Sequence, residues 1–338
     1  MSSRRWIITV FSIFFISMSL LATVNYTVDP FGIFGSNISQ NKYQINDRFV
    51  KASYIEEYHN EYNAYMFGSS RIGVVEPKLL EKYIPNTKFY NFTVSSANLH
   101  DYLLHLKYFI SKKYEIKVLY LQLDIDNMND YNQDSTDYLN QLHPRVSGDS
   151  VALFYARYLF GFFPLNIRKK IEVSLSNEIK KPYNMKTGVW RLPKYEKALT
   201  EDAKSYIENE KSFHFKNRRV VFYTKKEEDK KALKEMVELC SEQGIKLYVF
   251  TTPHNQNMMD TFVLEDYREY LKDISEVTSF YDFSGYNSVT TNNENYYEMS
   301  HYRPHVGEWV AARIFNDKNI EIPKDFGKLI ERGSLHGN

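Results

Sequence analysis

Cysteine is almost absent from this chain of 338 residues. Cys240 is the only one, so no disulfide can form within the chain and no metal site of several thiolates can be built. This usage suits the cytosol, and it suits equally a bacterial envelope protein that relies on its core.

The chain also has no large excess of charge of either sign, because its net charge is only +1. The chain therefore has no global field to attract nucleic acid, and no nucleic-acid partner is expected.

Repeats and low-complexity tracts are missing as well. Residues 126–137 (DNMNDYNQDSTD) resemble a calcium loop, but they lack the glycine at its sixth position and the glutamate at its twelfth. We interpret them as a polar loop, and we expect no metal and no cofactor. Aromatic residues, by contrast, are abundant: 28 Tyr and 23 Phe, in a chain that is 43% hydrophobic, exclude a disordered protein.

Charge is absent from one long stretch, between Trp6 and Val24. At about 1.5 Å per residue, a helix of this length just spans a bilayer core of roughly 30 Å. A cleaved signal peptide is the alternative, but Leu20 stands two residues before Ala22, where cleavage requires a small side chain. The sequence favours an uncleaved transmembrane anchor over residues 1–24.

The residues on either side of this stretch predict its orientation and the start of the next segment. Arg4 and Arg5 precede the apolar run, so the positive-inside rule keeps the N-terminus in the cytoplasm and places the rest of the chain outside. Residues 25–60 begin with a segment rich in Asn, Ser, Gly and Pro, which is typical of an extended juxtamembrane linker.

From about residue 60, short apolar runs alternate with amphipathic segments, a pattern typical of parallel βαβ units. We therefore predict an α/β domain over residues 61–326, followed by a tail over 327–338. Strands are predicted at 63–67, 88–92, 117–125, 246–253 and 279–283.

No clean alternation survives between the third and fourth predicted strands. We interpret residues 127–224 as an inserted cap subdomain. Within it, residues 151–165 (VALFYARYLFGFFPL) are apolar and aromatic. A helix packed on the core is the favoured interpretation, and contact with the membrane or a partner is the alternative.

The segment GSSR (68–71) follows the first predicted strand and precedes a helix. In an open parallel sheet, ligands bind beyond the carboxyl ends of the strands, near the point where strand order reverses. Ser70 is thus a candidate nucleophile, although a Gly-Ser-Ser turn is commonly just a helix cap. A serine hydroxyl needs a base, which is usually a histidine held by a third group.

His301 has the context that such a base requires. It follows the fifth predicted strand and precedes the last helix, so it is expected at the same sheet edge as Ser70. Glu298 lies three residues before it, a spacing that lets the carboxylate reach Nδ1 and leaves Nε2 for the nucleophile. Simple capping of the helix is the alternative. His254 ends the fourth strand and is a candidate substrate contact or spare base.

GSSR and EMSHYRP (298–304) resemble the first and last blocks of the SGNH (GDSL-like) hydrolase superfamily, in particular its membrane-anchored branch. That branch includes the D-alanyl transfer protein of teichoic acid synthesis and alginate acetylation proteins. The resemblance implies a three-layer α/β/α, flavodoxin-like fold with a parallel five-stranded sheet. It also implies Ser70 as nucleophile, His301 as base and Glu298 as its orienting acid, with Arg303 as a structural or substrate contact. Arg71, which follows Ser70, is a further candidate substrate contact, to which the resemblance gives no role.

Two further blocks of the superfamily are matched with departures. NFTVSSA (91–97) has Ser96 where a glycine is expected, and its backbone N–H is the candidate oxyanion donor beside that of Ser70. DIDN (124–127) has Asp126 in place of the asparagine that stabilises the oxyanion. A carboxylate cannot donate a hydrogen bond, so this role is lost, depends on protonation of Asp126, or passes to Asn127.

The predicted function is O-acylation, and most simply O-acetylation, of an envelope polysaccharide by a single-pass protein of the bacterial cell membrane. The resemblance implies a partner, a polytopic membrane-bound O-acyltransferase, for which residues 6–34 and 151–165 are the predicted docking segments. One alternative is an esterase or deacetylase that acts without a partner. The other is a catalytically silent scaffold that binds glycan or the acyltransferase.

Overall fold

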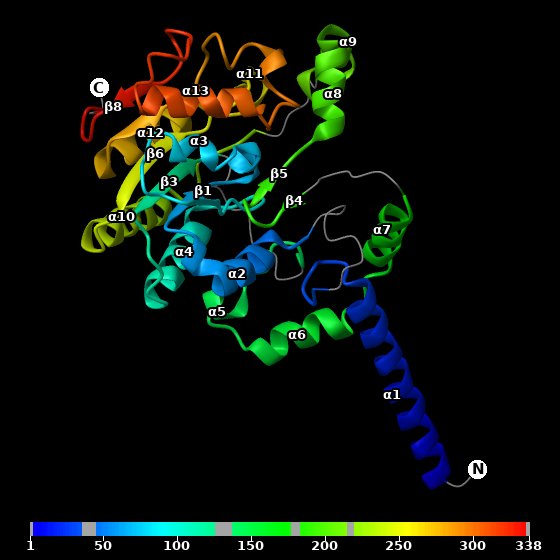
Figure 1. Ribbon diagram of the computed structural model, residues 1–338. Helices are drawn as coiled ribbons and strands as arrows, with labels where there is room; N and C mark the ends of the chain where they lie inside the picture. Colours follow the sequence, from blue (N-terminus) through cyan, green and yellow to red (C-terminus); the bar gives the residue numbers. More distant parts are fainter. Residues whose placement is uncertain (1–2, 36–44, 126–136, 177–182, 215–219, 336–338) are drawn as a thin grey trace. The chain divides into compact units, whose positions relative to one another are not determined.

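The computed structural model describes residues 3–35, 45–125, 137–176, 183–214 and 220–335. The chain divides into two compact units (Figure 1). The first combines residues 1–53 with 133–183, and the second combines residues 54–132 with 184–338. The predicted insertion 127–224 therefore contributes to both units, and the predicted linker 25–60 supplies part of the first.

A six-stranded sheet forms the centre of the second unit (Figure 1). Its strand order is β2-β1-β3-β6-β7-β8, and the first five strands are parallel. In chain order these five read 2-1-3-4-5, which is the flavodoxin-like arrangement. The strands are β1 (Ala64–Phe67), β2 (Phe89–Asn91), β3 (Val118–Leu123), β6 (Lys246–Thr251), β7 (Phe280–Asp282) and β8 (Lys328–Ile330).

The prediction of five parallel strands located each of these five but missed the sixth. β8 pairs antiparallel with β7, Ile330 opposite Phe280, and it lies in what was predicted as a tail. The segment is only three residues long, and two of them are exposed. It is thus too short to show either an apolar run or an alternation in the sequence.

Helices cover both faces of the sheet. Tyr65 and Phe67, two residues apart on β1, point to one face and contact Phe109 of α4. On β6, Tyr248 contacts Phe315 at the end of α13, and Figure 1 shows α4 and α13 on opposite sides of the strands. Every residue of β1, β2 and β3 is buried, as expected of parallel strands covered on both faces.

The covering helices follow the predicted crossover segments. α10 packs between α4 and α12, and α3 packs against α13. Asn98 begins α4 with a capping box shared with Asp101, which satisfies two otherwise unpaired backbone N–H groups. These helices are α3 (Lys78–Glu81), α4 (Leu99–Ser111), α10 (Lys226–Glu242), α12 (Leu264–Val277) and α13 (Pro304–Ile314).

Shorter elements complete the second unit. η2 (Ser70–Val74) follows β1, and β5 (Val189–Trp190) leads into α8 (Pro193–Glu201) and α9 (Ala203–Asn209). Strand β5 pairs with β4 (Tyr183–Asn184) in a separate two-stranded sheet. The remaining elements are η1 (His59–Glu61), η4 (Lys211–His214), α11 (Gln256–Met259) and η5 (Asn293–Asn295).

The first unit is helical and contains the N-terminal apolar helix. α1 is long and apolar enough to cross a membrane, which is compatible with a single-pass anchor or a signal sequence. It packs against α6 and α7, and the Asn25 side chain donates to the backbone oxygens of Leu159 and Gly161, 2.8 Å each. The helices are α1 (Ser3–Val28), α2 (Asp47–Tyr58, which continues into the second unit), α5 (Pro144–Ser147), α6 (Val151–Phe160) and α7 (Pro164–Leu175).

The core of this unit is aromatic. It includes residues from the predicted linker, which therefore is not merely an extended connection. Its helix α6 buries Phe154 and Tyr158 in this core, while other side chains of residues 151–165 stay exposed. The buried cluster is Phe31, Ile33, Phe49, Phe154, Tyr158 and Phe163.

Candidate active site

The turn after β1 presents Ser70. Ser69 is the N-cap of η2, and its Oγ accepts a hydrogen bond of 3.4 Å from the Arg71 N–H. A Cβ on Gly68 would lie 2.6 Å from the Ile72 side chain and 3.0 Å from that of Gln122. Only glycine fits this close passage, which turns the chain sharply and leaves Ser70 partly exposed at the carboxyl edge of the sheet.

Glu298 and His301 lie on one tight loop before α13. An antiparallel bridge between Tyr296 and Tyr302 closes the loop, and the Tyr297 N–H donates to the His301 oxygen over 2.9 Å. The chain thereby reverses between the bridge residues and brings the two side chains together. The Glu298 carboxylate bonds to His301 Nδ1 through one oxygen and accepts from the Ser300 N–H, 2.9 Å, through the other.

The structure brings the three residues of the predicted triad into one chain of hydrogen bonds. Ser70 Oγ lies 2.8 Å from His301 Nε2, and His301 Nδ1 bonds to Glu298. An ionised carboxylate can only accept, so the proton lies on Nδ1 and Nε2 accepts from the Ser70 hydroxyl. This is the tautomer that a general base requires.

The surroundings of Glu298 keep it ionised. Burial alone would raise the pKa of this carboxyl, but the hydrogen bond and charge of His301 oppose that effect, helped by the Ser300 N–H and the positive charge of Arg71. Together they outweigh burial and hold the pKa of Glu298 below its ordinary value. The carboxylate can therefore stabilise an imidazolium at neutral pH.

Two buried tyrosines fix the loop to the ends of the central strands. The Tyr302 hydroxyl accepts a 3.0 Å hydrogen bond from Gln122 Nε2 on β3, and the Tyr296 hydroxyl donates to the Pro253 oxygen beyond β6 over 2.8 Å. Both rings are at most 1% exposed. The position of His301 is thus set by the sheet itself.

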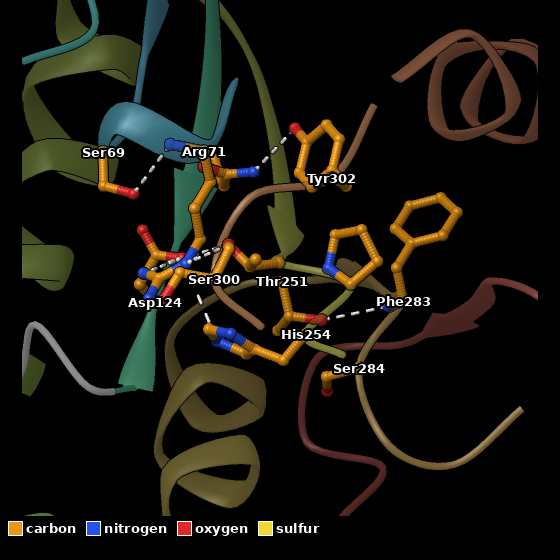
Figure 2. Close-up of polar contacts among 12 residues, drawn as sticks. Ser69, Arg71, Asp124, Thr251, His254, Phe283, Ser284, Ser300 and Tyr302 are labelled. Atoms are coloured by element: carbon orange, nitrogen blue, oxygen red, sulfur yellow. Dashed lines mark hydrogen bonds and ion pairs between the residues drawn. The ribbon is translucent and has the colours of Figure 1, made fainter. Parts of the chain in front are cut away.

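Arg71 joins the nucleophile turn to the His301 loop (Figure 2). Its Nε donates to the Ser300 oxygen over 3.1 Å, and its terminal nitrogen lies 3.1 Å from Asp124, the residue directly after β3. The side chains of both residues of this ion pair are more than 90% buried. Arg71 was predicted as a candidate substrate contact, but in the structure it bonds to Ser300 and Asp124 of the protein itself. The sequence did not single out Asp124.

His254 lies in the same buried cluster (Figure 2). Its Nε2 is 4.0 Å from Asp124, whose carboxylate also accepts from the Thr252 hydroxyl. Burial, with the nearby Arg71 charge, lowers the pKa of His254 to about 3, against the smaller opposing effect of Asp124. The imidazole is therefore neutral, and it is only 2% exposed.

Trp190 of β5 packs on the base. Its ring meets the His301 ring edge to face, with centroids 5.5 Å apart. A Cβ on Gly73 would lie 1.9 Å from the indole nitrogen, so η2 and β5 are in close contact here. Sequence reasoning missed Trp190, and the two-residue strand that carries it offers no pattern to find it by.

Of the predicted oxyanion donors, Ser70 and Ser96 lie among the described residues and Asn127 does not. Ser96 adopts a left-handed backbone conformation, with φ of +51°, in the place where the resemblance expects a glycine, the residue that favours this region. The loop that holds it is tied to the nucleophile turn, because the Val94 N–H donates to the Gly68 oxygen over 3.2 Å. Asp126, Asn127 and most of the polar loop 126–137 lie outside the described residues.

Arg303 connects the His301 loop to α8. Its guanidinium bonds to Glu196 and donates to the Glu294 oxygen over 3.0 Å. Glu196 also accepts from the Tyr297 hydroxyl, 2.7 Å. No motif or spacing in the sequence singles out Glu196 beforehand.

A pocket of about 670 Å³ opens beside these residues. All three segments that carry or support the triad contribute to it. Val74 and Glu76 follow Ser70, Arg191 follows Trp190, and Tyr297 and Pro304 flank the pair Glu298 and His301. The rest of the lining comes from α8 and the residue before it: Leu192, Pro193, Glu196, Lys197, Thr200 and Glu201.

Comparison of the sequence with models of known protein families finds no match, and comparison with curated proteins finds none either.

Among the described residues, no group of three His, Cys, Asp or Glu side chains is placed to hold a metal ion. The arrangement of Ser70, His301 and Glu298 can activate a hydroxyl for attack on an acyl carbon. The function is therefore inferred from this geometry.

Proposed function

We propose that the protein is a membrane-anchored, extracytoplasmic serine O-acyltransferase that acylates an envelope glycopolymer, with acetyl as the acyl group. The observation that carries the proposal is the hydrogen-bonded chain Ser70–His301–Glu298. It lies where the order of the parallel strands reverses, between β1 and β3, which is the usual place for a site in such a sheet. The resemblance of GSSR and EMSHYRP to the anchored SGNH branch supports acyl transfer to a polymer.

In the first half of the reaction, Ser70 Oγ attacks the carbonyl carbon of the acyl donor while its proton passes to His301 Nε2. Glu298 stabilises the imidazolium, and the backbone N–H groups of Ser70 and Ser96 receive the developing oxyanion. Collapse of the tetrahedral intermediate breaks the bond to the leaving group, which takes the proton from His301. The product is an ester on Ser70.

In the second half, an acceptor hydroxyl gives its proton to His301 and attacks the ester carbon. The Ser70–acyl bond breaks, Ser70 recovers the proton, and the acylated acceptor leaves. Water in place of the sugar hydroxyl would give an esterase, so the two activities differ only in what enters the site at this stage.

A polytopic membrane-bound O-acyltransferase supplies the acyl group in this proposal, and it docks on residues 6–34 and 151–165 in the first unit. Large apolar side chains stand exposed along this part of the chain, including Leu153, Phe162 and Leu165, which are 64%, 82% and 68% exposed. Exposed apolar side chains in such number are typical of protein or membrane contact.

The test is Ser70→Ala in cells whose polymer esters are measured, with Ser69→Ala as the matched control. Loss of an entire triad role lowers kcat by on the order of 10⁴ to 10⁶, so polymer acylation should disappear in the first variant. The second removes only a cap, worth about 1 kcal/mol, and should keep acylation. Unchanged acylation with a normally expressed Ser70→Ala protein would leave the scaffold alternative, while rapid partner-free hydrolysis of small esters, not diverted by added polysaccharide, would favour the esterase.

A further inference from the structure

The pocket beside the triad is far larger than an acetyl group requires. Its volume of about 670 Å³ is in the range, roughly 300–1,000 Å³, of pockets that enclose ligands of several rings. Its walls include Tyr297 and Pro304, which flank Glu298 and His301, and Val74 of the turn that carries Ser70. The three triad residues are not part of the lining, but Val74, Tyr297 and Pro304 belong to the segments that carry them, so a ligand held here contacts those segments.

The charged groups of the pocket occur as pairs of opposite sign. Glu76 pairs with Arg191, and Glu196 pairs with Arg303 just behind the lining. A third pair, Lys197 with Glu201 at 3.6 Å, lies along α8. The lining holds three carboxylates and two cations, and Arg303, which pairs with Glu196, brings the sum to zero. A strongly anionic or cationic polymer therefore gains little from this field.

The same pairs retain hydrogen-bonding capacity. A carboxylate has about four acceptor positions and a guanidinium has five N–H donors, so each partner of a pair can still bind a hydroxyl. Between them the lining is apolar, with Val74, Leu192 and Pro193 beside the Tyr297 ring. Such a surface, apolar with a few donors and acceptors, complements the C–H faces and hydroxyl edges of a sugar ring.

We propose that this pocket binds the acyl acceptor as a neutral, hydroxyl-rich glycan of several sugar units, with one hydroxyl directed to the Ser70 ester. The proposal rests on the proposed function for its acceptor role, but the binding itself does not require catalysis. It makes residues of α8, which lie in the predicted insertion and outside the matched blocks, the determinants of acceptor choice.

The test measures binding to the full-length Ser70→Ala protein in detergent by calorimetry. Tetramers of glucose and of N-acetylglucosamine are the neutral probes, and a galacturonate tetramer is the anionic probe. Thr200→Trp fills the pocket from an exposed position on α8, and Lys197→Trp is the second filling variant if the first fails to fold. Ser241→Trp is the matched control, since it places the same ring on an exposed hydroxyl position of α10.

At least one neutral tetramer should bind with Kd below roughly 10 mM, more tightly than galacturonate, and a filling variant should weaken it about tenfold or more. The Ser241→Trp protein should bind as the parent does. Tighter binding of galacturonate, no binding of either neutral tetramer, or no effect of pocket filling would each overturn the proposal. Persistence of acylation in Ser70→Ala cells would instead remove the proposed function, and the binding result would stand separately.

Discussion

At the scale of single residues, Glu298 decides which nitrogen of His301 is free to accept a proton. In Glu298→Gln the amide keeps the shape of the carboxylate but loses its charge, so neither the tautomer nor the imidazolium is stabilised. We expect kcat for a small ester to fall by about 10²–10⁴ with KM little changed. Steady-state kinetics on the purified protein measure both, and a variant that loses less than threefold in kcat would show that Glu298 does not support the base.

Arg71 and Asp124 form a buried ion pair whose two charges depend on each other. Arg71→Met or Asp124→Leu leaves one buried charge uncompensated, at a cost of about 3–5 kcal/mol. The double variant removes both charges and should be more stable than either single variant. Thermal unfolding of the four proteins measures this coupling, and additive losses in the double variant would contradict it.

The residue scale also shows what the sequence could predict about the site. Ser70 and His301 were found because each follows a recognisable strand, and parallel strands place their carboxyl ends at one edge. Asp124 follows a strand too, but its role comes from a contact with Arg71, 53 positions earlier. Trp190 and Glu196 contact the His301 loop through tertiary packing alone, which no local pattern predicts.

At the scale of elements, the helix α10 carries a carboxyl group in an unfavourable place. Asp229, in its first turn, is buried, and one of its oxygens has no hydrogen-bond partner among the described residues. Burial raises the pKa of Asp229 to about 8, against the opposing charge of Lys225. The folded protein thus binds a proton that the unfolded chain releases near pH 4.

Because that folded-state pKa is raised, the stabilising effect of protonated Asp229 is complete below about pH 4 and is lost as the pH rises toward 8. Asp229→Asn stays neutral at every pH, so it should be more stable than the parent by about 1–3 kcal/mol at pH 8.5 and by much less at pH 5. Melting temperatures at the two pH values test this. An equal difference at both would show that Asp229 does not titrate in this range.

The other elements show which helices and strands can be predicted from the sequence. The five parallel strands were predicted because each contains a short apolar run, and the helices between them because the intervening segments are amphipathic. β8 is too short for either signal. The sequence did not predict α2, because the linker before it is rich in turn-forming residues. The apolar residues of α2 itself also form no strong stripe along one face.

At the scale of the whole molecule, the chain builds its two units from interleaved segments. The sequence predicted one insertion over residues 127–224, yet residues 133–183 join the N-terminal segment and residues 184–224 join the sheet unit. Contacts such as those of Phe31 with Tyr158 and Phe163 decide this division. They join residues more than 120 positions apart, so composition and periodicity could not reveal them.

The same interleaving bears on whether the N-terminal helix is retained. α1 continues without a break to Val28, and its buried Asn25 donates to the backbone oxygens of Leu159 in α6 and of Gly161 just after it. Cleavage near Ala22 would cut this helix just before the residue that joins it to the folded unit. We therefore expect an uncleaved protein that stays in the membrane pellet after an alkaline wash, with the sheet unit open to protease from outside the cell.

Leu20→Ala provides the control, because it places small residues at both positions that a signal peptidase reads, 20 and 22. Part of this variant should be released as a shortened protein, which shows that the cellular machinery can reach the site. The parent should show its full mass and an intact N-terminal tag. If instead the parent protein is soluble and begins near residue 25, α1 is a signal sequence. Only four residues of this helix, Asn25 to Val28, would then remain to pack in the first unit.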